Sequence, residues 1–395
     1  DALLFPTRVH SQSQTIQSMQ ILLPGRSLPA SFASFGNLCR PLYPKAVRKR
    51  VTMKKLLNVL YVTAPESYLS LDGENVVIKK SETVSMRLPL HNLENIVCFS
   101  YTGASPALMG ACAERNIGLC FLTPHGRFLA RVSGKVKGNV LLRKRQFEVS
   151  QMEVECLRIS SSMLIGKLSN CRKVIERAIR DHPLSVDPLS LREASGKIKE
   201  NMKAVHGCAT IADLMGFEGS SAKIYFSVFD QLILQQKEAF RFTGRTRRPP
   251  LDNINALLSF LYSVLTNEVV SALEAVGLDP YVGFLHQDRP GRPSLALDLM
   301  EELRPVMADR LALSLVNLRQ ISGKGFEPKE SGGILMNDET RKIVLKNWQE
   351  RKNEPILHPF LNEKIEFGLL PHVQALLLAR YLRGDLDAYP PFFWG

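Results

Sequence analysis

The residues with the clearest chemical potential lie between positions 281 and 305. His286 ends an apolar extended segment, a loop containing Pro and Gly follows, and a helix is predicted to begin with Ser294 as its N-cap. On that helix Asp298 and Glu301 are three positions apart, so they project from neighbouring positions on one face. One imidazole and two carboxylates can hold a hard divalent cation. Acids at this spacing are also common on solvated helix faces, and His286 can equally be a hydrogen-bonded core histidine.

A second candidate acid, Glu218, lies in an apolar stretch between Phe217 and Gly219. A carboxylate in such surroundings needs a partner, or it becomes neutral. On a continuous helix Tyr225 falls on the same face as Glu218, and Lys223 is close enough to offer a positive charge to a phosphate. The alternative for Glu218 is a capping role near a helix start.

An arginine-rich loop, RFTGRTRR at 241–248, follows this helix. Such a loop can grip phosphates, or it can be a solvated loop without a ligand. Asp252 is predicted to cap a long apolar helix over 254–275, with Gly277 as its stop. The candidate DNA-contacting residues of the chain are Lys223, Tyr225, Arg245, Arg247, Arg248, Asn255 and Arg292.

Composition favours a polyanionic partner, because the 395 residues carry a formal net charge of +13. The seven cysteines are scattered and form no C-x-x-C pair. They are therefore expected to be small buried hydrophobes in a reducing compartment, neither disulfides nor a zinc site. No run of 18 apolar residues occurs, so no membrane span is expected.

Three regions follow from the patterning, and together they predict an α+β protein. Residues 1–52 are basic and nearly free of acids, which indicates a disordered or non-native extension. Short β-rich runs over 53–137 predict a small β-rich domain whose edge strands can pair with a second copy. Helical periodicity over 138–395 predicts a larger all-α catalytic domain.

Several segments resemble one family. MGFEGSSAKIYF at 215–226 is similar to its Glu motif, and GFLH at 283–286 with RPSLALDLMEELRP at 292–305 is similar to its His and acidic motifs. RRPPLDNINALLSF at 247–260 resembles the linking segment, and LLARYLRGDLDAYPPF at 377–392 resembles a type I-C-like subset. The family is the Cas-one integrases of CRISPR adaptation systems, and the similarity runs from about Met53 to Gly395.

The resemblance implies a metal triad on Glu218, His286 and the acidic helix, where Glu301 is our choice. Asp298 is then a fourth ligand or a support for the others. Mg²⁺ or Mn²⁺ is the expected metal. The implied reaction inserts short double-stranded DNA fragments into a CRISPR repeat by phosphodiester transesterification, with DNA endonuclease activity.

The resemblance also implies a homodimer, a small Cas-two partner dimer, an assisting Cas-four nuclease and a prokaryotic cytoplasmic location. Two alternatives stay open at this point. One is a metal-dependent nuclease specific for branched DNA, and the other is a non-catalytic DNA-binding scaffold subunit.

Overall fold

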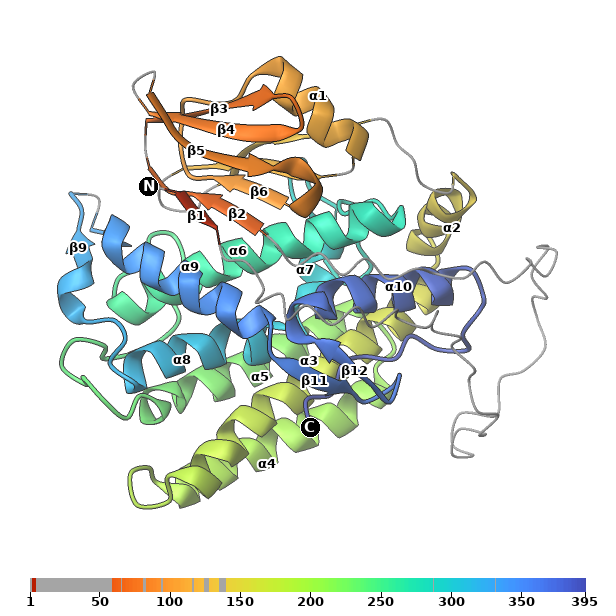
Figure 1. Ribbon diagram of the computed structural model, residues 1–395. Coiled ribbons are helices and arrows are strands. Elements are labelled where there is room, and N and C mark those ends of the chain that lie inside the picture. The colour runs from red at the N-terminus through yellow and green to blue at the C-terminus, as the bar shows by residue number, and fades with distance from the viewer. Residues whose placement is uncertain are drawn as a thin grey trace. The chain divides into compact units, whose positions relative to one another are not determined.

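The computed structural model describes residues 2–4, 59–64, 66–80, 83–93, 95–115, 117–123, 128–134, 140–286, 288–330 and 332–395. Apart from Ala2–Leu4, which forms strand β1, the predicted disordered extension over 1–52 lies outside these residues. The described residues form a β-rich region from residue 59 and a helical region from residue 140 (Figure 1).

Two sheets and one helix make up the β-rich region. A five-stranded sheet has the order β1-β2-β6-β7-β8, and β3, β4 and β5 form a three-stranded antiparallel sheet. The turn between β3 and β4 contains Gly73, whose φ of 55° lies in the left-handed region that favours glycine. The strands are β2 (Val59–Val62), β3 (Ser67–Asp72), β4 (Asn75–Lys80), β5 (Thr83–Pro89), β6 (Asn95–Cys98), β7 (Gly118–Leu122) and β8 (Phe128–Val132), and helix α1 is Pro106–Arg115.

Apolar side chains from both sheets and α1 form one core, which includes Leu60, Leu69, Ile96 and Leu108. β-Branched and aromatic residues dominate the buried strands, such as VLYV in β2, as expected for a pleated surface covered on both faces. The predicted β-rich domain is thus confirmed as a fold.

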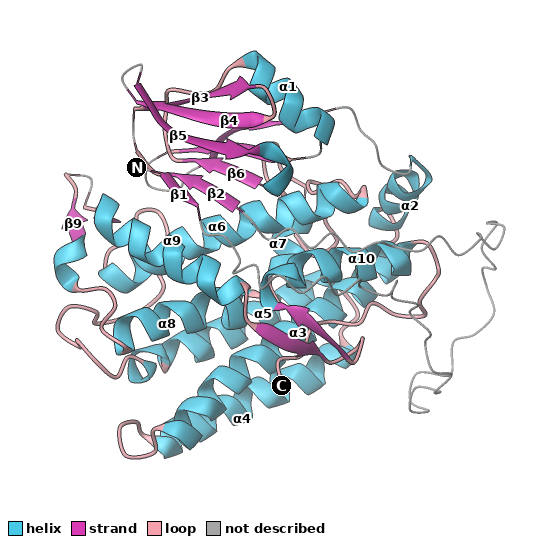
Figure 2. Ribbon diagram, viewed as in Figure 1, coloured by secondary structure: helices cyan, strands magenta, loops and turns pink. Residues whose placement is uncertain are grey.

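The second region is predominantly helical (Figure 2). Its helices are α2 (Val140–Ser150), α3 (Glu153–Asp181), α4 (Pro188–Ala204), α5 (Ile211–Ser227), α6 (Asn253–Val276), α7 (Ser294–Met300), α8 (Arg310–Asn317), α9 (Asp338–Lys352) and α10 (Leu370–Leu382). A π-helical turn, Arg304–Asp309, joins α7 to α8. Short 3₁₀ turns are Leu90–Asn92 in the β-rich region and Val205–Gly207, Phe229–Leu232, Gly323–Gly325 and Phe367–Leu369 here.

The expectation of an all-α second domain needs one correction. Two hairpins interrupt the helices, formed by β9 (Phe326–Pro328) with β10 (Ile334–Met336) and by β11 (Pro355–His358) with β12 (Glu363–Glu366). The connection between β9 and β10 contains Gly332 and Gly333. Three-residue strands carry too little alternation to stand out from a loop by pattern alone.

Helix α6 is the central strut of the helical region. It begins after Asp252, whose Oδ1 accepts a hydrogen bond from the Asn255 backbone N–H at 2.7 Å, and it stops at Gly277 with φ 88°, both as predicted. By length and composition α6 could cross a bilayer, with a mean hydropathy of 1.5. Since 61% of that window is buried against the protein itself, its apolar surface is accounted for by packing.

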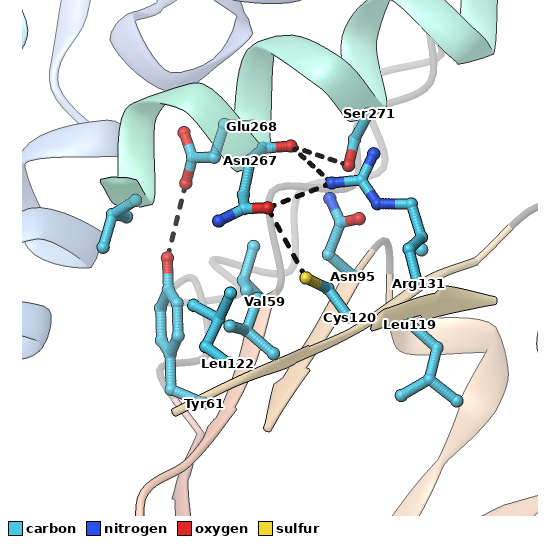
Figure 3. Close-up of a pocket in the computed structure, with 13 residues that line it drawn as sticks. Val59, Tyr61, Asn95, Leu119, Cys120, Leu122, Arg131, Asn267, Glu268 and Ser271 are labelled. Carbon is cyan, nitrogen blue, oxygen red and sulfur yellow. Dashed lines mark hydrogen bonds between the residues drawn. The ribbon is translucent and has the colours of Figure 1, made fainter. Parts of the chain in front are cut away.

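Polar contacts join the five-stranded sheet to α6 across a small pocket, and Figure 3 shows Tyr61 of β2 directed at Glu268 of α6. The Tyr61 hydroxyl donates to Glu268 Oε1 at 3.3 Å. Glu268 Oε1 also accepts from Trp348 Nε1 at 2.9 Å and from Lys352 Nζ at 2.8 Å, both on α9. One carboxylate therefore joins a strand, the central helix and α9.

We expect Glu268→Ala to lower the free energy of unfolding by about 3–5 kcal/mol, because it leaves the ammonium of Lys352 buried without its anion. The Lys352 side chain is only 5% exposed. Glu274→Ala is the matched control on the same helix. Glu274 is 38% exposed and pairs with Arg131, which keeps its bonds to Asn267, so the expected loss is below about 1 kcal/mol. Equal losses in urea denaturation would contradict this assignment.

Candidate metal centre and active site

Three elements bring a lysine and two carboxylates together inside the helical region. Helix α3 supplies Lys167, α5 supplies Glu218, and the residue directly after α7 is Glu301. The Lys167 ammonium forms an ion pair with Glu218 Oε1 and lies 2.6 Å from Glu301 Oε2. Glu218 thus has the partner that its apolar sequence context required. The two acids were predicted to meet, but the lysine between them was not.

The second partner of Glu301 is Arg304, whose Nη1 lies 2.7 Å from Oε1. Burial by itself raises the pKa of the Glu301 carboxyl, but Arg304 and Lys167 outweigh it and lower this pKa to about 2. Glu301 is therefore an anion at neutral pH. Its Oε1 pairs with Arg304 and its Oε2 lies 2.6 Å from the Lys167 ammonium, so each oxygen faces a cation.

Asp298 and His286 form a separate unit beside this pair. Both Asp298 oxygens are occupied by backbone N–H groups: Oδ2 accepts from Phe284 at 2.6 Å and Leu285 at 3.0 Å, and Oδ1 accepts from His286 at 3.0 Å. Oδ1 also lies 2.6 Å from His286 Nδ1. Because a buried carboxylate accepts, Nδ1 carries the proton and Nε2 is the ring nitrogen left with a lone pair.

The chain reaches this geometry through a close contact at Gly283. A Cβ there would lie 2.7 Å from Ser294 Cβ and 2.9 Å from Asp298 Oδ2, so only glycine lets the 283–286 loop pack on α7. Helix α7 begins at Ser294 with Pro293 in the N-cap position, one residue earlier than predicted. Of the two roles expected for Asp298, these contacts support positioning of His286 over direct metal ligation.

The turn that carries Glu301 is held from behind by the C-terminal segment. Glu302 is fully buried, and its Oε2 accepts from the Phe392 backbone N–H at 2.8 Å. Its Oε1 accepts from Gln374 Nε2 at 2.8 Å and from the Tyr389 hydroxyl. Burial raises the pKa of the Glu302 carboxyl to about 7. The tail therefore fixes the residue adjacent to Glu301.

The site residues are compatible with a hard divalent cation. Among the described residues no three His, Cys, Asp or Glu side chains already form a metal-binding group. The ammonium of Lys167 instead occupies the place between two carboxylates that a metal cation would take. Glu218, Glu301 and the imidazole of His286 supply oxygen and nitrogen donors of the kinds that such a cation accepts.

Four of the predicted DNA-contacting residues are accessible to a ligand. Lys223, Arg247 and Arg248 are exposed, and Arg292 is half-buried. Lys223 lies on α5, five positions after Glu218. The sequence-based expectation for these four residues remains a proposal.

The other three have structural contacts. Asn255 is fully buried and accepts from Arg245 Nη1 at 2.7 Å, while its amide donates to Gly244 O at 2.7 Å. The guanidinium of Arg245 also covers the Tyr262 ring at 5.3 Å. Arg245 and Asn255 thus hold the arginine-rich loop in place.

Tyr225 is only 2% exposed and donates to Asp309 Oδ2 at 3.2 Å. Its ring cannot stack on DNA from that position, so the expected DNA contact needs correction. The helical spacing from Glu218 was right, but it gives direction around a helix, not depth below the surface.

Lys167, Arg304 and Asp309 are site residues that sequence reasoning missed. A signal existed for Lys167, because it falls on the same face of α3 as the apolar residues Leu164, Leu168 and Cys171. A lysine inside such a face needs an anion in the fold. Arg304 and Asp309 gave no comparable signal.

Asp309 links two tyrosines beneath the site and gives the fold a pH dependence. It accepts from Tyr262 at 2.7 Å as well as from Tyr225. Burial is the largest influence and raises the pKa of Asp309 from 3.8 to about 6, although the two phenols oppose the shift. The folded state then holds a proton that the unfolded state has already lost.

We therefore expect stability to fall as the pH rises from about 4 to about 6, by up to about 3 kcal/mol from this group. Asp309→Asn should remove that part of the decline, because an amide does not titrate. Urea denaturation of both proteins at pH values across this range measures the difference. Parallel stability curves for the two proteins would contradict a raised pKa at Asp309.

Comparison with known proteins places these residues in a family. A profile described as CRISPR associated protein Cas1, the Cas-one family of the sequence analysis, matches residues 60–350. "CRISPR-associated endonuclease Cas1 2" of Rhodospirillum rubrum is 52% identical over 346 residues, which cover 87% of this chain and 100% of that protein. "CRISPR-associated endonuclease Cas1 1" of Chlorobaculum tepidum is 48% identical over 342 residues, with the same two coverages.

A relative from Geobacter sulfurreducens, a "CRISPR-associated exonuclease Cas4/endonuclease Cas1 fusion", is 35% identical and covers 84% of this chain and 60% of its own length. Among solved structures, a casposase bound to an integration product has a TM-score of 0.74 at 20% identity, covering 85% of this chain and 94% of that one. A Cas6-RT-Cas1–Cas2 complex has a TM-score of 0.72 at 22% identity and covers 88% of this chain and 37% of that one. At these identities the two structures show the fold alone.

Proposed function

The chain belongs to the CRISPR-associated Cas1 family, and we propose that Glu218, His286 and Glu301 form the metal centre of its integrase and endonuclease activity. As an enzyme of this family it acts on DNA phosphodiester bonds. The observation that carries the proposed site is the Lys167 ammonium, which lies between the carboxylates of Glu218 and Glu301. Two acids held this way, beside an imidazole with a free nitrogen, fit Mg²⁺ or Mn²⁺.

The integration reaction exchanges one phosphodiester for another. The 3′-OH of an incoming DNA end bonds to phosphorus in the target strand and loses its proton to solvent, while the bond to the target 3′ oxygen breaks and that oxygen takes up a proton from solvent. When bound, the metal polarises the phosphoryl oxygen and stabilises the leaving oxygen. Because the nucleophile belongs to DNA, no protein nucleophile is required.

The protein's own residues prepare this site. Arg304 and Lys167 keep Glu301 anionic at neutral pH, so it can donate lone pairs without first losing a proton. Asp298 holds the proton on His286 Nδ1 and turns Nε2 towards ligation. Exposed Lys223, Arg247 and Arg248 can contact the phosphates that flank the reacting bond.

The comparisons also support partners for this chain. The family and the Cas1–Cas2 complex support double-stranded DNA and a small Cas2 dimer as partners, and the fused relative supports assistance by a Cas4 nuclease. Exposed apolar side chains in the β-rich region, including Tyr101 at 72% and Phe128 at 48%, support a homodimer contact there. Free thiols at the six described cysteines fit a prokaryotic cytoplasm.

Glu218→Ala and His286→Ala should each abolish strand transfer and leave the DNA affinity measured without divalent metal within about twofold of wild type. Metal ligands act on the reacting bond, whereas affinity comes mainly from phosphate contacts. The assay joins a short duplex with free 3′-OH ends to a repeat-bearing plasmid in the presence of Mn²⁺ and the Cas2 partner. Glu200→Ala, an exposed acid on neighbouring α4, is the control and should keep full activity.

Full strand-transfer activity in folded His286→Ala protein would contradict the assignment of His286 as a metal ligand. Cut strands without joined strands would favour the alternative, a structure-specific nuclease of branched DNA. Metal binding with neither product, even with partners present, would favour a scaffold subunit.

DNA binding should weaken steeply with salt, because phosphate contacts release counterions. If Arg247 and Arg248 each contact a phosphate, the double variant Arg247→Ala/Arg248→Ala should reduce the slope of log affinity against log salt by about 2. Lys329→Ala is the control, since this exposed lysine is already paired with Glu327 at 3.1 Å. An unchanged slope in the double variant would show that the arginine-rich loop does not follow the DNA backbone.

A further inference from the structure

Lys167 is a buried cation at the point where the proposed metal must bind. Its side chain is 9% exposed, and that of Glu301 is 3% exposed. Its position on α3 is fixed from both sides, because Asn170, one turn further along, donates to Glu302 O at 2.7 Å and to Phe392 O at 2.9 Å. The ammonium therefore cannot be treated as a surface charge that swings freely into solvent.

The charges around Lys167 balance in the metal-free protein. Glu218 and Glu301 supply two negative charges, and Lys167 and Arg304 supply two positive charges. A divalent cation that enters while both basic residues stay charged leaves the site with two excess positive charges. In a buried site such an excess is costly. A DNA phosphodiester brings one negative charge and lowers that cost.

From this balance, and resting on the proposed function, we propose that Lys167 is a displaceable counter-ion that couples divalent-metal binding to DNA binding. Without DNA, its ammonium holds Glu218 and Glu301 and competes with the metal for both. When a phosphate arrives, the ammonium leaves the carboxylates for the phosphate oxygens, and the metal takes its place. Each ligand then raises the affinity of the other by the same factor.

This role differs from that of the other buried lysine in the region. Lys352 also forms a buried ion pair, with Glu268 Oε1 at 2.8 Å, but that carboxylate already has Tyr61 and Trp348 as donors. Lys352 therefore helps to hold α9 and β2 against α6. Lys167 instead bridges two acids from different elements, Glu218 on α5 and Glu301 directly after α7.

The test is the affinity for Mn²⁺, measured by electron paramagnetic resonance of the free ion, with and without a branched DNA duplex. Lys167→Gln should raise the DNA-free Mn²⁺ affinity at least about tenfold, because a unit charge within about 4 Å is removed. Addition of DNA should raise the Mn²⁺ affinity of wild type, and it should raise that of the variant by a smaller factor. Lys352→Gln is the control and should bind Mn²⁺ like wild type.

A second measurement guards against loss of folding. Removal of Lys167 leaves the buried carboxylate of Glu301 and the partly exposed carboxylate of Glu218 without the cation between them, so the metal-free variant should melt earlier than wild type. Mn²⁺ should then raise the melting temperature of Lys167→Gln by more than it raises that of wild type. Lys167→Met should give the same pattern.

Unchanged or weaker Mn²⁺ affinity in folded Lys167→Gln protein would overturn the proposal. So would a DNA-dependent gain in Mn²⁺ affinity that is as large in the variant as in wild type. Failure of the proposed function gives a different result: Glu218→Ala would then bind Mn²⁺ as tightly as wild type, because Glu218 would not be a ligand.

Discussion

The helical region depends on one electrostatic constraint, which is that Glu218 and Glu301 can lie close together only with a cation between them. Two carboxylates without compensation would take up a proton or separate. Lys167 meets the requirement in the structure, and Arg304 adds a second positive charge next to Glu301. The low pKa of Glu301, about 2, reports the outcome: this acid stays charged in a place where burial alone would raise its pKa.

The surrounding fold holds the partners of this cluster at fixed positions. Helix α3 carries Lys167 at its middle and Asn170 one turn on, and Asn170 ties both the turn after α7 and the C-terminal segment. Both carboxylate oxygens of Asp298 accept hydrogen bonds from the backbone of the loop that carries His286. Each residue proposed to touch the metal is thus supported by a neighbour that touches the protein, an arrangement typical of metal sites.

Sequence patterns predicted the elements well where a local rule decides the structure. Asp252 and Gly277 marked the ends of α6 because capping and a left-handed stop depend only on neighbouring residues. The acids and the histidine could be chosen as candidate site residues for a similar reason. A polar or charged side chain in an apolar stretch of sequence needs a partner in the fold. The identity of that partner was not local: Lys167 and Glu218 come from different helices, and spacing along a chain does not say which helices pack together. The burial of Tyr225 and Asn255 could not be predicted from the sequence, because burial is a tertiary property.

The most direct test of the metal centre is a crystal of the protein soaked with Mn²⁺ and measured at a wavelength where manganese scatters anomalously. We expect one anomalous peak between the carboxylates of Glu218 and Glu301, within coordination distance of His286 Nε2. The Lys167 ammonium should have moved away from at least one of the two carboxylates. A peak at other residues, or no peak while Lys167 still bridges the two acids, would contradict the proposed metal centre.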